Sequence, residues 1–257
     1  ATARVLRPAA DPRRADLVRC AAASDGAGGA GGAARAAPLW LPSVGVGTWS
    51  WGNEDFGPGP GHDALAGAFE ASLDAGAFLF DTAPTYGKGV SEETLGRLAA
   101  AGRYAVFATK YYPRARDRDL ASAMVDLARQ SVKRLHPADG ALDLFQLHRV
   151  AEQPHSLEEQ ADALARVVRS GLARAVGVCN CSLDELRAIR TRLLEAHGVA
   201  LGTCQVELSL VRQLPAASGF IAACRAMGVV VLAYSPLAMG RLSGRHDPLR
   251  GAGPRWG

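Results

Sequence analysis

The sequence predicts an α/β protein in which a parallel sheet is covered by helices. Short apolar runs recur along the 257 residues, and a helical pattern separates each of the first five from the next; the runs are residues 77–80, 104–109, 142–147, 173–178, 204–206 and 229–233. Strands that are apolar almost throughout are typical of parallel sheets, because helices bury both faces of such sheets. A doubly wound sheet and a closed barrel both fit this pattern.

The segments around these strands have recognisable boundaries. Residues 40–46 indicate a hairpin, and an apolar stripe at helical spacing then leads to Gly76, where the first helix should end. Residues 156–159 and 182–185 both have the Ser-x-x-Glu pattern of a capping box, in which the two side chains satisfy backbone N–H groups of the first turn. The remaining helix markers are the stripe Leu65, Phe69 and Leu73, the stripe Leu120, Met124, Leu127 and Leu135, and the terminating glycines Gly171 and Gly198.

Polar residues follow three consecutive strands at the point where each strand ends. The run 77–80 stops at Asp81, and a proline and a glycine then break the backbone, so Asp81 and Tyr86 should lie on a loop. The next two strands end at Lys110 and His148. Asp81 and Tyr86 alone are equally compatible with a structural role, and a lone lysine or histidine at a strand end is usually a solvated or structural residue. Together they favour a barrel over an open sheet, because barrel enzymes place their active sites at the carboxyl ends of the strands.

The loop after the first strand resembles the signature of the aldo-keto reductases. Residues 81–87 fit the family's Asp-Thr-Ala-x-x-Tyr-Gly motif, and residues 91–96 fit its Ser-Glu-x-x-Leu-Gly continuation, where we expect Ser91 to cap a helix. The resemblance covers residues 39–245 and implies a (β/α)8 TIM barrel. Since only six strands are assigned, we expect this barrel to lack its last two βα units, which would leave sheet edges unpaired. The resemblance places the catalytic residues at Asp81, Tyr86, Lys110 and His148.

These four residues suit the reduction of a carbonyl group. A free tyrosine, with a pKa of about 10, is a poor acid at neutral pH. We expect Lys110 to lower the pKa of Tyr86, and Asp81 to keep the buried lysine charged. His148 can donate a hydrogen bond to the carbonyl oxygen and orient the substrate. No metal is required, because the hydride would come from a nicotinamide.

The resemblance also implies that the cofactor is NADP(H). Asn180 and Cys179, which replaces the family's usual serine, would hold the nicotinamide carboxamide together with Gln205. Tyr234 would stack on the nicotinamide ring, and Arg149 stands where the family usually has tryptophan, which implies a more polar substrate pocket. The implied cofactor-binding residues are Gly47, Thr48, Trp49, Asp81, Cys179, Asn180, Gln205, Tyr234, Ser235, Leu237 and Arg245.

Residues 1–38 differ in composition from the rest of the chain. They contain six arginines and three aspartates, no glutamate or lysine, and are otherwise mostly alanine, glycine and proline. Such a segment cannot offset the cost of ordering, so we expect it to be disordered and to precede a barrel domain at residues 39–257. The G-x-G-x-x-G match at residues 26–31 is attributed to low complexity, because no strand precedes it. Many arginines and few acids indicate a transit peptide.

The pattern Gly-Thr-Trp-x-Trp-Gly-Asn at residues 47–53 is similar to that of the plastid members of the family. With the transit-like segment, it predicts the chloroplast or plastid stroma, and the cytoplasm is the alternative. The first 38 residues supply six positive and three negative charges of a net +4, so the remainder is close to neutral and nucleic acid is not an expected partner. No apolar run approaches the ~18 residues of a membrane span. Five cysteines, an odd number, argue against a secreted disulfide framework.

Two functions are open at this point. The first is an NADP(H)-dependent oxidoreductase that reduces small aldehydes or ketones to alcohols, with tyrosine as the proton donor. The alternative is a non-catalytic, truncated or regulatory relative that binds nicotinamide. The complete set of four catalytic residues favours the enzyme, because a scaffold has no need of it, and the missing strands favour the alternative.

Overall fold

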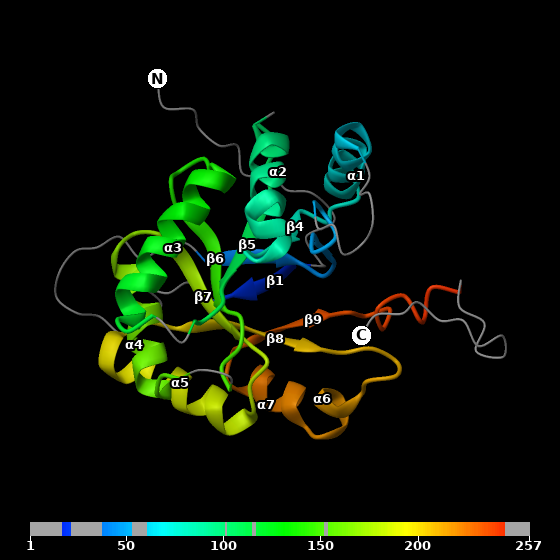
Figure 1. Ribbon diagram of the computed structural model, residues 1–257. Coiled ribbons are helices and arrows are strands. Elements are labelled where there is room, and N and C mark those ends of the chain that lie inside the picture. Colours follow the sequence, from blue (N-terminus) through cyan, green and yellow to red (C-terminus); the bar gives the residue numbers. More distant parts are fainter. Residues whose placement is uncertain are drawn as a thin grey trace.

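The structure, a computed structural model, describes residues 17–21, 38–52, 61–100, 102–114, 117–151 and 154–244. Within these residues, seven strands form one parallel sheet in the order β3-β4-β5-β6-β7-β8-β9, so that each strand pairs with the next along the chain. The sheet curves into a nearly closed barrel, and the helices lie around its outside (Figure 1). The predicted α/β barrel is confirmed.

Strands and helices alternate regularly through most of the chain. The barrel strands are β3 (Gly45–Gly47), β4 (Leu79–Asp81), β5 (Val106–Tyr111), β6 (Leu142–Leu147), β7 (Ala173–Cys179), β8 (Leu201–Glu207) and β9 (Val230–Tyr234). The helices are α1 (His62–Asp74), a short 3-10 turn η3 (Tyr86–Gly89), α2 (Val90–Ala99), α3 (Leu120–Leu135), α4 (Leu157–Arg169), α5 (Leu183–His197), α6 (Leu214–Ala217) and α7 (Phe220–Ala226).

The sequence does not reveal the first barrel strand. β3 consists of only Gly-Val-Gly, without an apolar run, and it pairs in parallel with β4, where Gly45 lies opposite Leu79. The expected hairpin over residues 40–46 is therefore wrong, because its two arms belong to different sheets. The expected number of strands also needs correction: the described residues form seven barrel strands, whereas the sequence indicates six.

A second correction concerns the amino-terminal segment. β1 (Leu17–Cys20) pairs antiparallel with β2 (Leu39–Pro42), so the expected disorder of residues 1–38 is wrong for residues 17–20. Pairing with β2 and the burial of Cys20, which packs at the amino ends of the barrel strands, both help to offset the cost of ordering these four residues. Its cluster contains Leu39, Leu41, Leu79, Val106, Ala108, Leu144 and Ala175. The expectation that no strand precedes the G-x-G-x-x-G match at residues 26–31 is wrong, because β1 does, and the match itself lies outside the described residues. The domain boundary at residue 38 stays a prediction.

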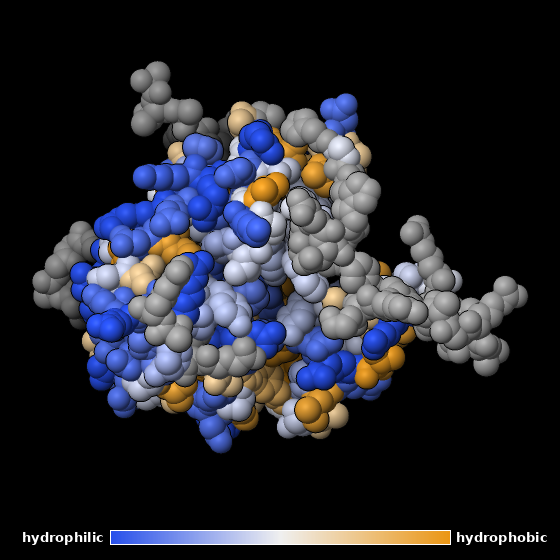
Figure 2. All heavy atoms as spheres, in the orientation of Figure 1, coloured by the Kyte–Doolittle hydropathy of each residue, from blue (hydrophilic) through white to orange (hydrophobic). Residues whose placement is uncertain are grey.

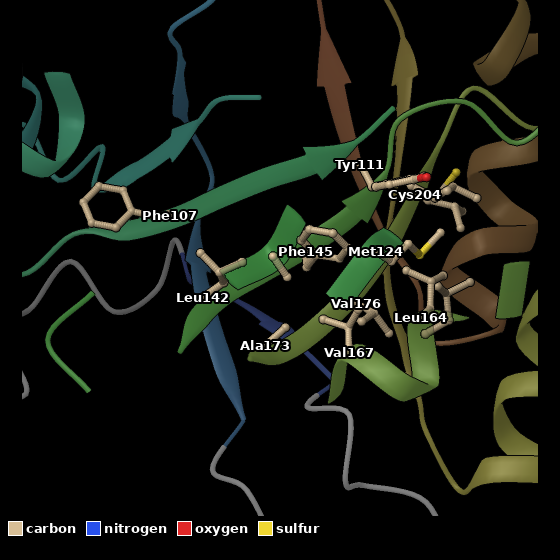
Figure 3. Packing of buried hydrophobic residues seen from close by; sticks show 14 of the residues in the cluster. Phe107, Tyr111, Met124, Leu142, Phe145, Leu164, Val167, Ala173, Val176 and Cys204 are labelled. Atoms are coloured by element: carbon tan, nitrogen blue, oxygen red, sulfur yellow. The ribbon is translucent and has the colours of Figure 1, made fainter. Parts of the chain in front are cut away.

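The side chains of each barrel strand alternate between two cores, as the period of a β-strand requires. Leu144 and Ala175 face the barrel interior, where the β1–β2 hairpin packs. The next residues along the two strands, Phe145 and Val176, belong to the outer core, which also contains Met124 of α3 (Figure 3). Because the same alternation continues to the carboxyl ends of the strands, polar residues there enter the barrel interior.

The helix boundaries agree with most of the capping signals. Ser156 and Ser182 each accept a hydrogen bond from the third backbone N–H of their helix, and both capping boxes are complete. Gly198 ends α5 in the left-handed conformation, with φ 64°. The prediction for Ser91 is wrong: α2 starts after Gly89, so Ser91 is already helical and its hydroxyl is used elsewhere.

The face of the molecule drawn in Figure 2 is largely polar, with scattered apolar side chains. The large apolar side chains with the greatest exposure, Leu210, Val211 and Leu214, lie on or just before α6. Among the described helices, none is both long enough and apolar enough to cross a membrane.

Candidate active site

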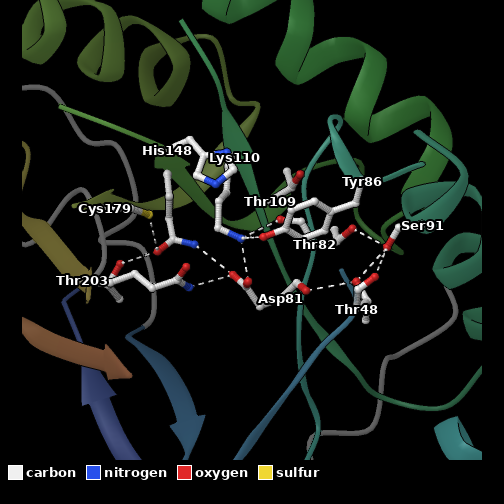
Figure 4. Close-up of polar contacts among 12 residues, drawn as sticks. Thr48, Asp81, Thr82, Tyr86, Ser91, Thr109, Lys110, His148, Cys179 and Thr203 are labelled. Atoms are coloured by element: carbon white, nitrogen blue, oxygen red, sulfur yellow. Dashed lines mark hydrogen bonds and ion pairs between the residues drawn. The ribbon is translucent and has the colours of Figure 1, made fainter. Parts of the chain in front are cut away.

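The strand register brings the four predicted catalytic residues to one end of the barrel. Asp81 is the last residue of β4, Lys110 lies near the end of β5, and His148 directly follows β6. Tyr86 begins the turn η3 after β4, and its ring points back towards the lysine (Figure 4). The structure thus places together all four residues that the sequence singles out.

Lys110 is the centre of this group. Its side chain is completely buried, and its Nζ donates to Asp81 Oδ2 at 2.5 Å and to the carbonyl oxygen of Thr82 at 3.0 Å. The same Nζ lies 3.3 Å from the hydroxyl of Tyr86. A buried ammonium is stable only when its charge is paired and its N–H groups are satisfied, and these three contacts meet both conditions.

Burial and the charge of neighbouring groups have opposite effects on the pKa values of Lys110 and Tyr86. Burial by itself lowers the pKa of Lys110, but Asp81 and the other nearby groups outweigh it, so the pKa lies above its ordinary value and the lysine is charged. Burial raises the pKa of Tyr86, and Lys110 lowers it by a smaller amount. Lys110 therefore acts on the pKa of Tyr86 in the expected direction, but burial is the largest effect and leaves this pKa above its ordinary value. At neutral pH the phenol keeps its proton.

His148 lies next to Tyr86 and Lys110 and is held neutral (Figure 4). Burial, followed by the positive charges of Lys110 and Arg149, lowers the pKa of His148 to about 3. Its ring lies edge-on to those of Tyr86 and Tyr112, with centroids 6.2 Å and 5.5 Å away. Its Nδ1 is buried without a hydrogen-bond partner. A neutral imidazole has one N–H, which can serve as a hydrogen-bond donor to a substrate oxygen.

Two glutamines complete the surroundings of Asp81. Gln205 Nε2 donates to Asp81 Oδ1 at 2.9 Å, and Gln146 Nε2 donates to the same oxygen at 3.3 Å. Gln146 Oε1 in turn accepts from Thr203 at 3.4 Å and from the thiol of Cys179 at 3.8 Å. Sequence reasoning missed Gln146. The available signal was its position two residues before His148 on an otherwise apolar strand, which places its side chain inside the barrel.

Three buried hydroxyl groups hold the ends of β3 and β4 against α2. Ser91 Oγ lies 2.7 Å from Thr48 Oγ1 and 2.8 Å from Thr82 Oγ1, and it donates to the carbonyl oxygen of Thr48 at 3.0 Å. Thr48 Oγ1 also donates to the carbonyl oxygen of Asp81 at 3.0 Å. The hydroxyl of Thr48 is therefore turned into the protein, whereas the sequence expectation assigned Thr48 to the cofactor.

Comparison with known proteins shows which family the chain belongs to. The sequence model of the Aldo/keto reductase family matches residues 43–255, most of the chain. The chain belongs to the aldo/keto reductase family. Chloroplastic pyridoxal reductase of Arabidopsis thaliana is 34% identical over 239 residues, covering 85% of this chain and 63% of that protein. The chain thus spans less than two thirds of the length of this curated relative.

Solved structures of the family have the same fold. Glycerol dehydrogenase from Gluconobacter oxydans superimposes with a TM-score of 0.75 at 27% identity, covering 94% of this chain and 69% of that one. An aldo-keto reductase of Klebsiella pneumoniae in complex with NADPH has a TM-score of 0.67 at 28% identity, covering 81% of this chain and 70% of that one.

Several expected cofactor residues of this aldo/keto reductase lie along the rim formed by the carboxyl ends of β7, β8 and β9: Cys179, Asn180, Gln205 and Tyr234. Asn180, at φ 55°, donates from Nδ2 to the carbonyl oxygen of His148 at 3.0 Å. Tyr234 donates its hydroxyl to Asn180 Oδ1 at 2.8 Å. Cys179 is fully buried beside them, and burial raises the pKa of its thiol, which therefore stays protonated.

The other expected cofactor residues are less enclosed. Trp49 is 42% exposed and tilts over Tyr86 at 6.3 Å between ring centroids, and Gly47 is exposed beside it. Ser235 contacts Met239 Sδ at 3.5 Å, and Leu237 is 55% exposed. Arg245 lies outside the described residues.

The side chains on this rim fit a nicotinamide carboxamide, which both donates and accepts hydrogen bonds. Asn180 and Gln205 carry amide groups with the same dual capacity, and the contacts described above use only part of it. Tyr234 adds an aromatic face of the kind that orients a flat ring. The residues present therefore fit the cofactor that the family implies.

Proposed function

We propose that this chain is an NADP(H)-dependent oxidoreductase that reduces aldehydes or ketones to alcohols, with Tyr86 as the proton donor. One observation carries the proposal: the hydroxyl of Tyr86 lies 3.3 Å from the buried Nζ of Lys110, which Asp81 holds at 2.5 Å. A phenol next to a fixed positive charge is a general acid that becomes easier to deprotonate during the reaction.

The proton step follows from the charges of these residues. When bound, the reduced nicotinamide supplies a hydride to the carbonyl carbon. Negative charge then develops on the carbonyl oxygen, and Tyr86 donates its proton there. Lys110 stabilises the phenolate that forms, and Asp81 keeps the lysine charged throughout. Because burial raises the pKa of Tyr86, the phenol keeps its proton before the reaction. Lys110 contributes when that proton is lost, by stabilising the negative charge of the phenolate.

His148 would bind and orient the substrate. Its neutral ring stands edge-on to Tyr86, so an N–H on the open side can point to the oxygen that receives the proton. A charged histidine next to Lys110 would add a second buried cation, which burial disfavours. The similarity to a pyridoxal reductase supports a small aldehyde as the substrate class.

One observation, the unpaired edges of the barrel sheet, favours the alternative of a relative that binds nicotinamide without catalysis. The described strands β3 and β9 do not pair with each other, so each has an unpaired edge within the described residues. For location we propose the plastid, on the similarity to a chloroplastic protein and the composition of residues 1–38.

Titration of the purified chain with NADPH and NADH, followed by turnover with a panel of small aldehydes including pyridoxal, tests the proposal. We expect saturable binding of NADPH and aldehyde-dependent oxidation of the bound cofactor. Binding without turnover on any aldehyde or ketone would support the non-catalytic alternative. Absence of binding to either nucleotide would contradict both functions.

A further inference from the structure

Three cysteine side chains meet on the outer face of the barrel, away from the group around Lys110. Cys204 lies in β8, Cys181 in the loop after β7 and Cys224 in α7. The sulfur atoms of Cys181 and Cys204 are 3.7 Å apart. Cys204 and Cys224 are buried, and Cys181 is partly exposed. The site chemistry described above uses none of the three.

The structure gives the two close thiols different access to solvent. Cys181 can meet a small reagent at the surface, whereas Cys204 is fully enclosed behind it. Their sulfur atoms are at contact distance, and a disulfide needs about 2.0 Å, so a small movement of the loop carrying Cys181 closes the gap. Of the other cysteines, Cys224 is buried next to Cys204, Cys179 faces Gln146 inside the barrel, and Cys20 packs at the amino ends of the strands.

We propose that Cys181 and Cys204 form a peroxide-reactive dithiol, and that their disulfide is a modification site of this protein. The thiolate of Cys181 attacks one oxygen of hydrogen peroxide, the O–O bond breaks, and hydroxide leaves and takes up a proton. The sulfur of Cys204 then attacks the resulting sulfenic acid, the S–O bond breaks, and a second water leaves with the proton of Cys204. In total, two thiols and one peroxide give one disulfide and two waters.

The backbone connects Cys181 and Cys204 to the cofactor rim, that is, to the rim formed by β7, β8 and β9 where Asn180, Gln205 and Tyr234 lie. Asn180 immediately precedes Cys181, and Gln205 immediately follows Cys204. The N–H of Asn180 donates to the carbonyl oxygen of Gln205 at 3.0 Å, so these two short segments are already tied together. Drawing the two sulfur atoms together shifts the loop that holds Asn180 against Tyr234. Oxidation therefore weakens nucleotide binding, a consequence that rests on the proposed function.

The bond itself is tested by mass spectrometry of the full chain. The reduced chain is treated with an equimolar amount of hydrogen peroxide, then alkylated and digested with trypsin without reduction. Cleavage at arginine leaves Cys181 in the peptide 175–187 and Cys204 in the peptide 193–212. We expect these two peptides to be joined with the loss of two hydrogen atoms, and Cys181→Ser to abolish the link.

Cys179 and Cys181 lie in the same tryptic peptide, so the mass of the joined peptides does not say which of them is linked to Cys204. Cys179→Ala is therefore the matched variant, and it should keep the link. A link that survives Cys181→Ser, a link between Cys204 and Cys224 instead, or no link after oxidation would overturn the proposal. The substitution at Cys181 lies on a partly exposed loop, and its folding can be checked by circular dichroism. Cys20→Ala, at the opposite end of the barrel, should also keep the link.

The functional consequence has a separate readout. Oxidation should raise the Kd for NADPH by about tenfold, within the range of coupling between linked sites, and reduction with dithiothreitol should restore it. Cys181→Ser should show the same Kd before and after peroxide. If the reduced chain does not bind NADPH, the proposed function fails, and the peptide link alone decides whether the dithiol exists. An unchanged Kd in a fully linked protein would overturn the coupling to the cofactor rim.

Discussion

Asp81 and Lys110 form an ion pair of 2.5 Å inside the barrel, and the lysine side chain is completely buried. Lys110 also contacts Tyr86, whose hydroxyl lies 3.3 Å from the Nζ of Lys110. Such a pair contributes little to stability when complete, but the loss of one partner leaves an uncompensated buried charge. Its main effect is to fix a positive charge beside a phenol.

Lys110→Met should therefore impair both stability and catalysis. It leaves Asp81 unpaired in the barrel, which should lower the free energy of unfolding by about 3–5 kcal/mol, and it removes the charge that assists Tyr86, which should lower turnover by ~10²–10⁴. Urea unfolding and steady-state kinetics measure the two effects. Lys133→Met on α3 is the control and should change neither. A stable Lys110→Met protein with wild-type turnover would refute the assigned role of the pair.

Adding Asp81→Asn to Lys110→Met should recover part of the lost stability, because the double variant has no unpaired charge. It should not recover turnover, because the phenol still lacks its cation. Equal stability of the single and double variants would show that the unpaired carboxylate of Asp81 is not what destabilises the Lys110→Met protein.

Ser91→Ala tests the cluster of buried hydroxyl groups. Removing Ser91 Oγ leaves the hydroxyl of Thr82 and the carbonyl oxygen of Thr48 short of a partner, which should cost about 1–3 kcal/mol in unfolding free energy. Ser131→Ala is a closely matched control, because Ser131 Oγ is equally buried but has no hydrogen-bond partner. This control should be neutral or slightly stabilising. If Ser91→Ala and Ser131→Ala change the unfolding free energy equally, the hydrogen bonds of this cluster do not contribute to stability.

The depressed pKa of His148 predicts a dependence of stability on pH. The unfolded histidine takes up a proton as the pH falls below about 6.5, whereas the folded one stays neutral until about pH 3. The unfolded chain therefore binds more protons in this window, and the free energy of unfolding decreases as the pH falls through it. Between pH 7 and pH 5 the contribution of His148 is at most about 2 kcal/mol.

Urea unfolding of the wild type and of His148→Gln at both pH values isolates this contribution from the other titrating groups. The wild type should lose more stability than the variant on acidification. Parallel pH profiles for the two proteins would mean that His148 titrates normally in the folded state.

The sequence was sufficient for the features that depend on local pattern. Asp81, Lys110 and His148 could be found because each directly follows or closes a strand, and parallel strands bring such residues to one edge. Gly198 and the two capping boxes needed only local rules. The barrel class followed from the alternation of apolar runs with helices.

Other features depend on partners that are distant in the sequence. β3 is too short to carry an apolar pattern, and β1 becomes a strand only through its pairing with β2. Gln146 acquires a role because the register of β6 with its neighbours turns its amide to Asp81. The direction of the Tyr86 pKa depends on how deeply the folded chain buries the phenol, which the presence of Lys110 in the sequence does not reveal.

The most direct test of the account is Tyr86→Phe, compared with the wild type for both NADPH affinity and turnover of a small aldehyde. Removing only the hydroxyl deletes the proton donor, so turnover should fall by ~10²–10⁴ while the Kd for NADPH stays within about twofold. Tyr104→Phe, which removes a hydroxyl from a ring packed on Phe78 ahead of β5, should leave both quantities unchanged. If Tyr86→Phe keeps more than half of the wild-type turnover, Tyr86 is not the proton donor and the proposed mechanism is wrong.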